Sequence, residues 1–200
     1  MRIAAIVVLA ACGGAPKKVA LRAEFPAQCS SDYDDVTETW TRTAKMRGEY
    51  QEVLDLRTVF KSPEWRCAHA IRDTEQRGLA GAARDSAFAQ ARADTAGAYE
   101  VELFVTTWDR KENDLDRGKR SVWRIVLVDD AGREVEPMEI VKDKRSMGVL
   151  RAEFGKVDDF AVAYVARFPP TPPLLGPNVK ALRLRMTSER GGVEVAWEAR

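Results

Sequence analysis

The stretch Tyr99-Glu100-Val101-Glu102-Leu103-Phe104-Val105-Thr106-Thr107-Trp108 decides the fold. Apolar side chains recur at every second position from Tyr99 to Val105, and polar residues stand between most of them. A period of two residues is that of a β-strand, because successive side chains point to opposite faces of a sheet. The sequence keeps this period almost to its C-terminus, which predicts β-structure throughout the second half of the chain.

Six further strands are predicted downstream, around residues 123–127, 135–141, 149–154, 160–168, 182–186 and 193–197. Turn signals separate them, most clearly Asp129-Asp130-Ala131-Gly132 and Glu189-Arg190-Gly191-Gly192. Pro137 interrupts the second of these strands, which favours an edge position because proline cannot donate to the ladder. Residues 169–177 hold five prolines and predict a stiff, polyproline-like crossing.

The first half of the chain mixes strands and helices. Residues 36–44 contain four threonines with Val36 and Trp40, which favours a strand over the competing helix. A second strand is expected over residues 50–60. Ser62-Pro63-Glu64 is a typical helix start, so a helix is predicted from Pro63 to about Gln76, and the alanine-rich residues 80–95 predict another.

These elements predict an α+β domain over residues 32–200. About nine short strands would form an antiparallel β-sandwich, because strands with one apolar face must bury that face against a second sheet. The two helices would form an insert after the second strand, over residues 62–96. The last hairpin ends in Trp197 on its apolar face and resembles immunoglobulin-like and fibronectin-III-like modules.

The N-terminus carries Arg2, the short apolar run 3–11 and then Cys12. Leu9-Ala10-Ala11-Cys12 resembles the lipobox of a bacterial lipoprotein signal. The apolar run 3–11 is far shorter than the roughly 20 residues that a membrane-spanning helix needs. The resemblance implies that residues 1–11 are removed and that Cys12 carries acyl chains. In lipoproteins of diderm bacteria, an aspartate directly after the acylated cysteine retains the protein in the inner membrane. Because Gly13 holds this position, the resemblance implies the outer membrane, with the domain facing the periplasm. An ordinary secretory signal is the alternative.

Residues 12–31 follow as an expected flexible tether, with Gly-Gly-Ala-Pro-Lys-Lys and no sustained periodicity. After removal of the signal peptide, which contains Arg2, the chain would have 31 basic and 31 acidic residues. Neither half of the chain has the basic surplus that nucleic acid would require, so no nucleic-acid partner is expected. The lipid would provide the contact with the membrane.

The chain has three cysteines. If Cys12 carries lipid, the roles of Cys29 and Cys67 remain to be assigned. Exported proteins fold in an oxidising compartment, which favours a Cys29–Cys67 disulfide over two buried thiols. A thiol nucleophile or metal ligand is the least favoured alternative, because His69 is the sole histidine and no CxxC spacing exists. His69 itself is expected to be a partly buried helix residue without a catalytic role.

A set of short motifs resembles an uncharacterised group of bacterial lipoproteins, to which no activity is attached. Cys67 lies outside that pattern, so the disulfide would be peculiar to this chain. The motifs are Trp40-Thr41-Arg42, Lys61-Ser62-Pro63-Glu64-Trp65-Arg66, Asn113-Asp114-Leu115, Ser121-Val122-Trp123-Arg124, Glu136-Pro137 and Phe168-Pro169.

Catalytic motifs for nucleophilic, metal or phosphate chemistry are absent from the sequence, so no catalytic residue, metal or cofactor is predicted. Asn113, Asp114 and Asp116 resemble half of a calcium loop, but a solvated charged turn is favoured over calcium. The loop 111–120 and the crossing 169–178, the latter through Pro172 and Leu174, are the candidate contact sites.

Two functions stay open at this stage. The favoured hypothesis is a lipid-anchored, non-catalytic module that binds an envelope protein or cell-wall partner or holds an assembly together. The alternative is a hydrolase of envelope polymers that uses a pair of carboxylates. An exposed apolar patch would favour the first function, and a cleft with two converging acids would favour the second.

Overall fold

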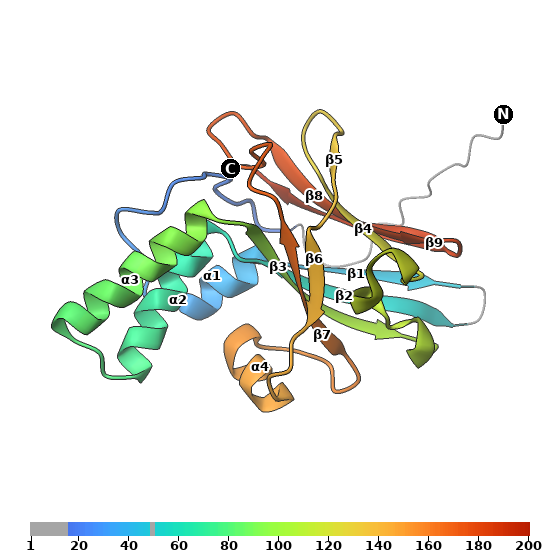
Figure 1. The fold of residues 1–200 in the computed structure, drawn as a ribbon, viewed down its shortest axis with the longest axis horizontal. Helices are drawn as coiled ribbons and strands as arrows, with labels where there is room; N and C mark the ends of the chain where they lie inside the picture. The colour runs from blue at the N-terminus through green and yellow to red at the C-terminus, as the bar shows by residue number, and fades with distance from the viewer. Residues whose placement is uncertain (1–15, 49–50) are drawn as a thin grey trace.

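The computed structural model describes residues 16–48 and 51–200 and shows an α+β fold with nine strands in two antiparallel sheets (Figure 1). The five-stranded sheet has the order β1-β2-β3-β7-β6, and the four-stranded sheet has the order β5-β4-β8-β9. The strands are β1 (Thr41–Arg47), β2 (Glu52–Phe60), β3 (Tyr99–Thr107), β4 (Arg124–Val128), β5 (Glu134–Val135), β6 (Glu139–Lys142), β7 (Val162–Phe168), β8 (Ala181–Ser188) and β9 (Gly191–Glu198).

The stretch that begins at Tyr99 is the centre of the larger sheet. β3 pairs with β2 on one side, with Leu56 opposite Val105, and with β7 on the other side, with Leu103 opposite Tyr164. The side chains of these four residues point toward the smaller sheet, and we call this side of the larger sheet the inner face. There, Phe60 of β2 packs 5.5 Å from Trp197 of β9, so the two sheets share one core.

Helix α4 (Met147–Phe154) lies against the opposite side of the larger sheet, which we call the outer face, whereas α1 (Tyr33–Trp40), α2 (Pro63–Gln76) and α3 (Gly81–Ala96) are grouped at one end of the sheets (Figure 1). Phe154 at the end of α4 packs at 5.4 Å on Phe104, which points outward from β3. The longer helices follow β2 in the chain and precede β3.

The start of α2 agrees with the sequence-based expectation. Ser62 is the N-cap and its hydroxyl accepts a hydrogen bond from the Trp65 N–H at 3.0 Å, while Pro63 takes the first helical position. One turn further, Trp65 itself is buried. Helix α3 contributes no fully buried residue and packs along α2.

The strand predicted for residues 36–44 is wrong in its first half. Asp32 caps helix α1 by accepting a hydrogen bond from the Asp35 N–H, and Val36 and Trp40 are buried on the same side of that helix. The β-branched threonines favour a strand, but the Asp32 cap and the four-residue spacing of Val36 and Trp40 favour the helix more strongly. The chain turns extended only at Thr41, where β1 begins.

Two other predictions need correction. Residues 149–154 form the helix α4 instead of a strand, because Ser146 caps it and Leu150 and Phe154 share its buried side at a spacing of four. Residues 135–141 form two strands, since Pro137 separates β5 in the smaller sheet from β6 in the larger one. Both are edge strands, as expected for a segment broken by proline.

Part of the expected tether packs onto the domain. Val19 is fully buried and forms a parallel bridge with Ala199, and Leu21 is also buried. The guanidinium of Arg42 donates to the Lys17 carbonyl at 2.7 Å and to the Ala196 carbonyl at 2.6 Å, which joins this segment to β1 and β9. Apolar burial and backbone pairing therefore begin well before residue 32.

The lipobox Leu9-Ala10-Ala11-Cys12 lies outside the described residues. Among the helices that the structure describes, none is long and apolar enough to span a membrane. Cys29 and Cys67 form the predicted disulfide, which ties the segment before α1 to the first half of α2.

Candidate functional site

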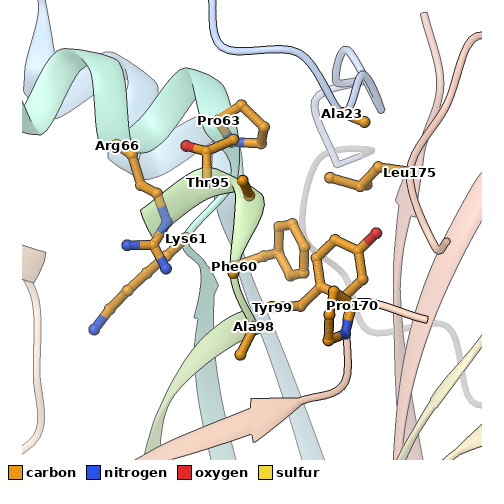
Figure 2. A pocket seen from close by; sticks show the side chains of 12 residues that line it. Ala23, Phe60, Lys61, Pro63, Arg66, Thr95, Ala98, Tyr99, Pro170 and Leu175 are labelled. Atoms are coloured by element: carbon orange, nitrogen blue, oxygen red, sulfur yellow. The ribbon is translucent and has the colours of Figure 1, made fainter. Parts of the chain in front are cut away.

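The candidate site is a cavity of about 190 Å³ where β2 passes into α2, next to the end of α3 and the start of β3. We call it the junction cavity. Figure 2 shows the rings of Phe60 and Tyr99 side by side in it, with Pro170 and Leu175 beyond them. The Pro-rich crossing between β7 and β8 thus forms one wall of the cavity.

Backbone hydrogen bonds hold these walls in place. The Lys61 N–H donates to the Glu100 carbonyl at 2.9 Å, which keeps the end of β2 beside the start of β3. The Tyr99 hydroxyl accepts a hydrogen bond from the Leu174 N–H at 3.1 Å and so fixes the crossing. With the Phe60 and Tyr99 ring centroids 6.2 Å apart, the cavity has a largely aromatic floor.

Two cations, Lys61 and Arg66, form the opposite side of the cavity. In Figure 2 their side chains extend together, away from the aromatic rings. Arg66 Nη2 lies 3.2 Å from Glu100 Oε2, and Arg167 Nε donates to Glu100 Oε1 at 2.8 Å. Although burial favours the neutral form of Glu100, Arg167 together with the positive charges of Lys61 and Arg66 lowers the pKa of this carboxyl.

Lys61 also reaches Glu102, which points outward from β3 and has an exposed fraction of 0 %. Its Nζ lies 2.9 Å from Glu102 Oε2 as an ion pair, but without the orientation of a hydrogen bond. Among the described residues, neither carboxylate oxygen of Glu102 has a hydrogen-bond partner. Burial, and to a smaller extent the charge of Asp143, raise the pKa of Glu102 to about 7, against the opposing effect of Lys61.

Arg145 links Glu102 to helix α4. Its guanidinium pairs with Asp143 at 2.6 Å and with Glu153 of α4, and lies 3.8 Å from Glu102. Burial favours the neutral form of Asp143, but the hydrogen bonds from Arg145 lower the pKa of this carboxyl. We call Lys61, Glu102, Asp143, Arg145 and Glu153 the outer-face charge cluster.

His69 has the position that the sequence predicts. It lies on α2 with 38 % of its side chain exposed, stacks on Trp65 at 4.9 Å and has Nε2 3.8 Å from Glu153 Oε1. Burial lowers the pKa of His69, and the charge of Glu153 opposes this in part. No cysteine thiol is free beside it, because Cys67 is held in the disulfide.

The loop 111–120, expected as a charged turn, contains two short 3₁₀ segments, η1 (Arg110–Glu112) and η2 (Leu115–Arg120). Asn113 donates through its side chain to the Val105 carbonyl at 2.7 Å. Asp114 is buried and accepts hydrogen bonds from the Ser121 hydroxyl and the Val122 N–H. Both side chains therefore hold the loop on the domain.

The remaining predicted site residues do not converge. Asp116 is on the exposed side of this loop and pairs with Lys142 at 3.3 Å. Leu174 is buried, while Pro172 is half-buried and follows a cis peptide bond. In the parts of the chain that the structure describes, no group of three or more His, Cys, Asp or Glu side chains could hold a metal ion.

The junction cavity is not predicted by the sequence, although the crossing 169–178, which forms one of its walls, is a predicted contact site. Its other walls come from residues that look ordinary in sequence: Lys61 and Arg66 flank a helix start, and Tyr99 opens a strand. Glu102 gives no signal either, because it stands at a polar position of the alternating pattern that begins at Tyr99.

Comparison with known proteins adds little to this geometry. No protein-family model and no curated protein matches the chain. A crystal structure of a protein of unknown function from Burkholderia pseudomallei K96243 is similar over 70 % of this chain and 72 % of its own, with 12 % sequence identity and a TM-score of 0.33.

Proposed function

We propose that this protein is a lipid-anchored module of the cell envelope that binds a partner without catalysis, through the junction cavity. The anchor rests on the lipobox that ends at Cys12, which would place the domain at the outer membrane, facing the periplasm. The immunoglobulin-like class of the sandwich belongs to the same proposal and is supported by the hairpin β8–β9, whose Trp197 is buried.

The observation that carries the binding function is the composition of the junction cavity. Phe60, Tyr99 and Leu175 line the concave site; Tyr99 is half-buried, whereas Phe60 and Leu175 are almost fully buried, and Lys61 and Arg66 extend from its other side. Pockets that are mostly apolar, with a few placed polar groups, are typical of binding sites. The partner, an envelope protein or cell-wall component, would insert an apolar group there.

A hydrolase that uses a carboxylate pair is the second candidate, because Glu102 faces Asp143 and the pKa of Glu102 is raised. Such a pair must reach the bond it cleaves. Glu102 has no exposed surface, which favours the binding function. Release of soluble fragments from purified envelope polymers, lost in Glu102→Gln, would instead support the hydrolase.

The binding function is tested by crosslinking and pull-down from intact cells, with the anchored protein as bait. Thr95→Phe should fill the junction cavity from the end of α3 and abolish capture of the partner. Ala89→Phe is the matched control, because Ala89 is exposed on the same helix and does not line the cavity. Equal capture by both variants would refute the cavity as the binding site.

The anchor has its own test. Cys12→Ser should remove both acylation and cleavage, so the variant should keep the mass of the unprocessed chain and fail to incorporate an alkyne-tagged palmitate. If Cys12→Ser is still trimmed to the polypeptide mass of the parent, an ordinary secretory signal is the correct interpretation.

A further inference from the structure

We propose that the domain lies directly on the membrane that holds the lipid of Cys12, with the side formed by β1 and β9 facing the phospholipid headgroups. The side formed by β5 and β6 then faces away from the bilayer. This inference rests on the proposed lipid anchor. It adds the surface that contacts the membrane and the orientation of the domain on it.

The first observation is that the chain packs onto the domain soon after the lipobox. The Val19 N–H donates to the Glu198 carbonyl at 2.8 Å, and the Val19 carbonyl accepts from the Arg200 N–H at 3.0 Å. The Leu21 carbonyl accepts from the Gly176 N–H at 2.8 Å. Val19 and Leu21 are also buried. Backbone pairing and apolar burial therefore make this stretch an integral part of the domain.

Arg42 of β1 fixes the beginning of the same stretch. Its buried guanidinium donates to four backbone carbonyls, those of Lys17 at 2.7 Å, Thr39 at 2.9 Å, Thr41 at 2.7 Å and Ala196 at 2.6 Å. Lys17 is thus tied to β1 and to β9 through one side chain. We call the residues from Lys17 to Leu21 the docked segment.

The chain between the lipid and this fixed point is short. Lys17 follows Cys12 by five positions, and a fully extended chain spans at most about 3.6 Å per residue. The two Cα atoms are therefore within about 18 Å of each other, whatever the conformation between them. A domain of this size has a radius of gyration of about 16 Å and hence a diameter of about 40 Å. Because the reach is less than half of this diameter, the far side of the domain cannot turn toward the bilayer.

The docked segment is what makes the reach short. The next fixed point along the chain is Cys29, which is bonded to Cys67. If the docked segment were detached, the reach from Cys12 to Cys29 would be about 60 Å, which exceeds the diameter of the domain. Every surface could then meet the membrane. Burial of Val19 and Leu21 therefore converts a flexible tether into a constraint on orientation.

The topology of the two sheets determines which side faces the bilayer. The docked segment joins β1 and β9, which are the neighbouring edge strands of the larger and the smaller sheet. The opposite edges are β6 and β5, which are connected through Pro137. Since neighbouring strands lie about 4.8 Å apart, β6 is about 19 Å from β1 across the larger sheet. The β5–β6 side is therefore the side away from the anchor.

Charge contributes little to this contact. Lys17 Nζ pairs with Asp35 at 2.6 Å and lies 3.6 Å from Glu38, both on the exposed side of α1. These acids offset the attraction of Lys17 for anionic headgroups and leave Lys18 and Arg200 as the nearby exposed cations. The short reach, rather than a basic patch, holds this side on the bilayer. We therefore expect the orientation to be insensitive to salt.

The test is quenching of a fluorophore by the bilayer at two positions. With Cys12 acylated and Cys29 and Cys67 in the disulfide, one added cysteine provides a single thiol for labelling. Glu38→Cys marks the side of the docked segment, and Met138→Cys, at a position 59 % exposed beside β6, marks the opposite side. The full-length acylated protein is reconstituted into vesicles of phosphatidylethanolamine and phosphatidylglycerol. A fraction of the lipids carries a nitroxide on the headgroup, which quenches only at short range.

The label at position 38 should be quenched about fivefold or more strongly than the label at position 138, at low and at high salt, because the reach is shorter than the domain. Four Gly-Gly-Ser repeats inserted between Gly14 and Ala15 add about 43 Å of chain. The ratio of quenching at the two positions should then fall to about one. The insertion precedes the docked segment, so every contact that the structure describes stays in place.

A second variant tests the docked segment itself. The double substitution Val19→Asp and Leu21→Asp should detach this segment, because two carboxylates cannot be buried there without partners, and should also bring the ratio to about one. Lys18→Asp is the matched control, since Lys18 is an exposed residue of the same segment. It should keep the ratio of the parent. If the double variant does not fold, the insertion variant still decides the question.

The outcomes separate this inference from the proposed anchor. An acylated parent that is quenched equally at both positions, or at neither, would overturn the inference and leave the anchor intact. An unchanged ratio in the insertion variant, or equal quenching in Cys12→Ser, would show that the surface binds lipid by itself, and this would also overturn the inference. A parent whose mass shows no acyl chains would refute the anchor and the inference together.

Discussion

On the inner face of the five-stranded sheet, Phe60 packs between Trp40 and Trp197, with ring centroids 5.7 and 5.5 Å away. On the outer face, Phe154 packs against Phe104, but the neighbouring positions hold Glu102, Lys61 and other charged groups. The inner face is buried, and the outer face is buried around Glu102 and Phe104 but open to solvent toward its edge strands. The inner layer is held by apolar contacts, whereas the outer layer combines aromatic stacking with ion pairs.

The difference teaches what each layer can do. Apolar burial stabilises a domain by about 25 cal/mol per Å² and is insensitive to pH. The attraction within a buried ion pair often does no more than offset the cost of desolvating the two charges, so such pairs are weak evidence of stability. A layer of that kind can, however, change its properties when one group takes up a proton. The inner face therefore maintains the fold, and the outer face is the place to look for a response to conditions.

The largest effect is expected at the inner face. Trp197 is fully buried and its indole N–H donates to the Trp40 carbonyl at 2.9 Å. Trp197→Ala should lower the free energy of unfolding by about 3–5 kcal/mol, because it leaves a cavity and an unpaired carbonyl. Urea unfolding followed by circular dichroism measures this change.

The matched control is Trp108→Ala, since Trp108 is 65 % exposed at the end of β3. Its effect should stay within about 0.5 kcal/mol. If the two variants lose similar stability, the inner face is not the main source of stability and the contrast between the two faces fails.

The next effect concerns the disulfide that secures the helices at one end of the sheets. Cys29–Cys67 closes a loop with a sequence separation of 38 residues. In the chain-entropy model, a loop of this size contributes about 4 kcal/mol, so Cys67→Ala should cost about 3–4 kcal/mol. Urea unfolding of the oxidised and the reduced parent gives the reference; a parent that is equally stable after reduction would contradict the prediction.

The fold could be predicted where local pattern and tertiary structure agree. Ser62 and Pro63 predict the start of α2, and the alternation of apolar and polar residues after Tyr99 predicts β3. Prediction failed for residues 36–44 because their β-branched composition favours a strand, while the Asp32 cap and the burial of Trp40 favour a helix. Intrinsic propensity is a weak signal that tertiary contacts override.

The candidate site was less predictable, for a physical reason. The disulfide follows from two cysteines and an oxidising compartment. The junction cavity instead depends on segments near residues 60, 97 and 175 that meet only through the order of the strands. Neither the burial of Glu102 nor its contact with Lys61 can be read from spacing in the sequence.

A smaller effect should appear at the outer face as a pH dependence. Because the pKa of Glu102 is raised from its ordinary value to about 7 in the folded protein, the folded state binds its proton more tightly than the unfolded state. Stability is therefore present at acidic pH and is lost as the pH rises through about 7. Between pH 5 and pH 8 the loss should be about 1–3 kcal/mol.

Urea unfolding at several pH values measures this dependence, with Glu102→Gln as the variant that cannot titrate. The difference in unfolding free energy between the parent and Glu102→Gln should change by that amount across the range. The exposed acid of β6 serves as the control: Glu139→Gln should follow the parent. A profile of Glu102→Gln that parallels the parent would show that another group controls the outer face.

The smallest effect is expected at His69, on the same face but with the opposite sign. Burial lowers the pKa of His69, so the folded state disfavours its charged form. The contribution to stability is present above the ordinary pKa of histidine, near 6.5, and is lost as the pH falls below it. The exposed part of the ring and the nearby Glu153 keep this effect small.

At pH 7.5, His69→Gln should cost no more than about 1 kcal/mol, which corresponds to the loss of its stacking on Trp65. This cost should shrink as the pH falls from 6.5 to 5, because the parent then loses stability that the variant does not. A cost that grows over this range would mean that the contact with Glu153 outweighs burial. Partner capture should be unchanged in His69→Gln, since this residue lies outside the junction cavity; a loss of capture in a variant that is still folded would place His69 in the functional site.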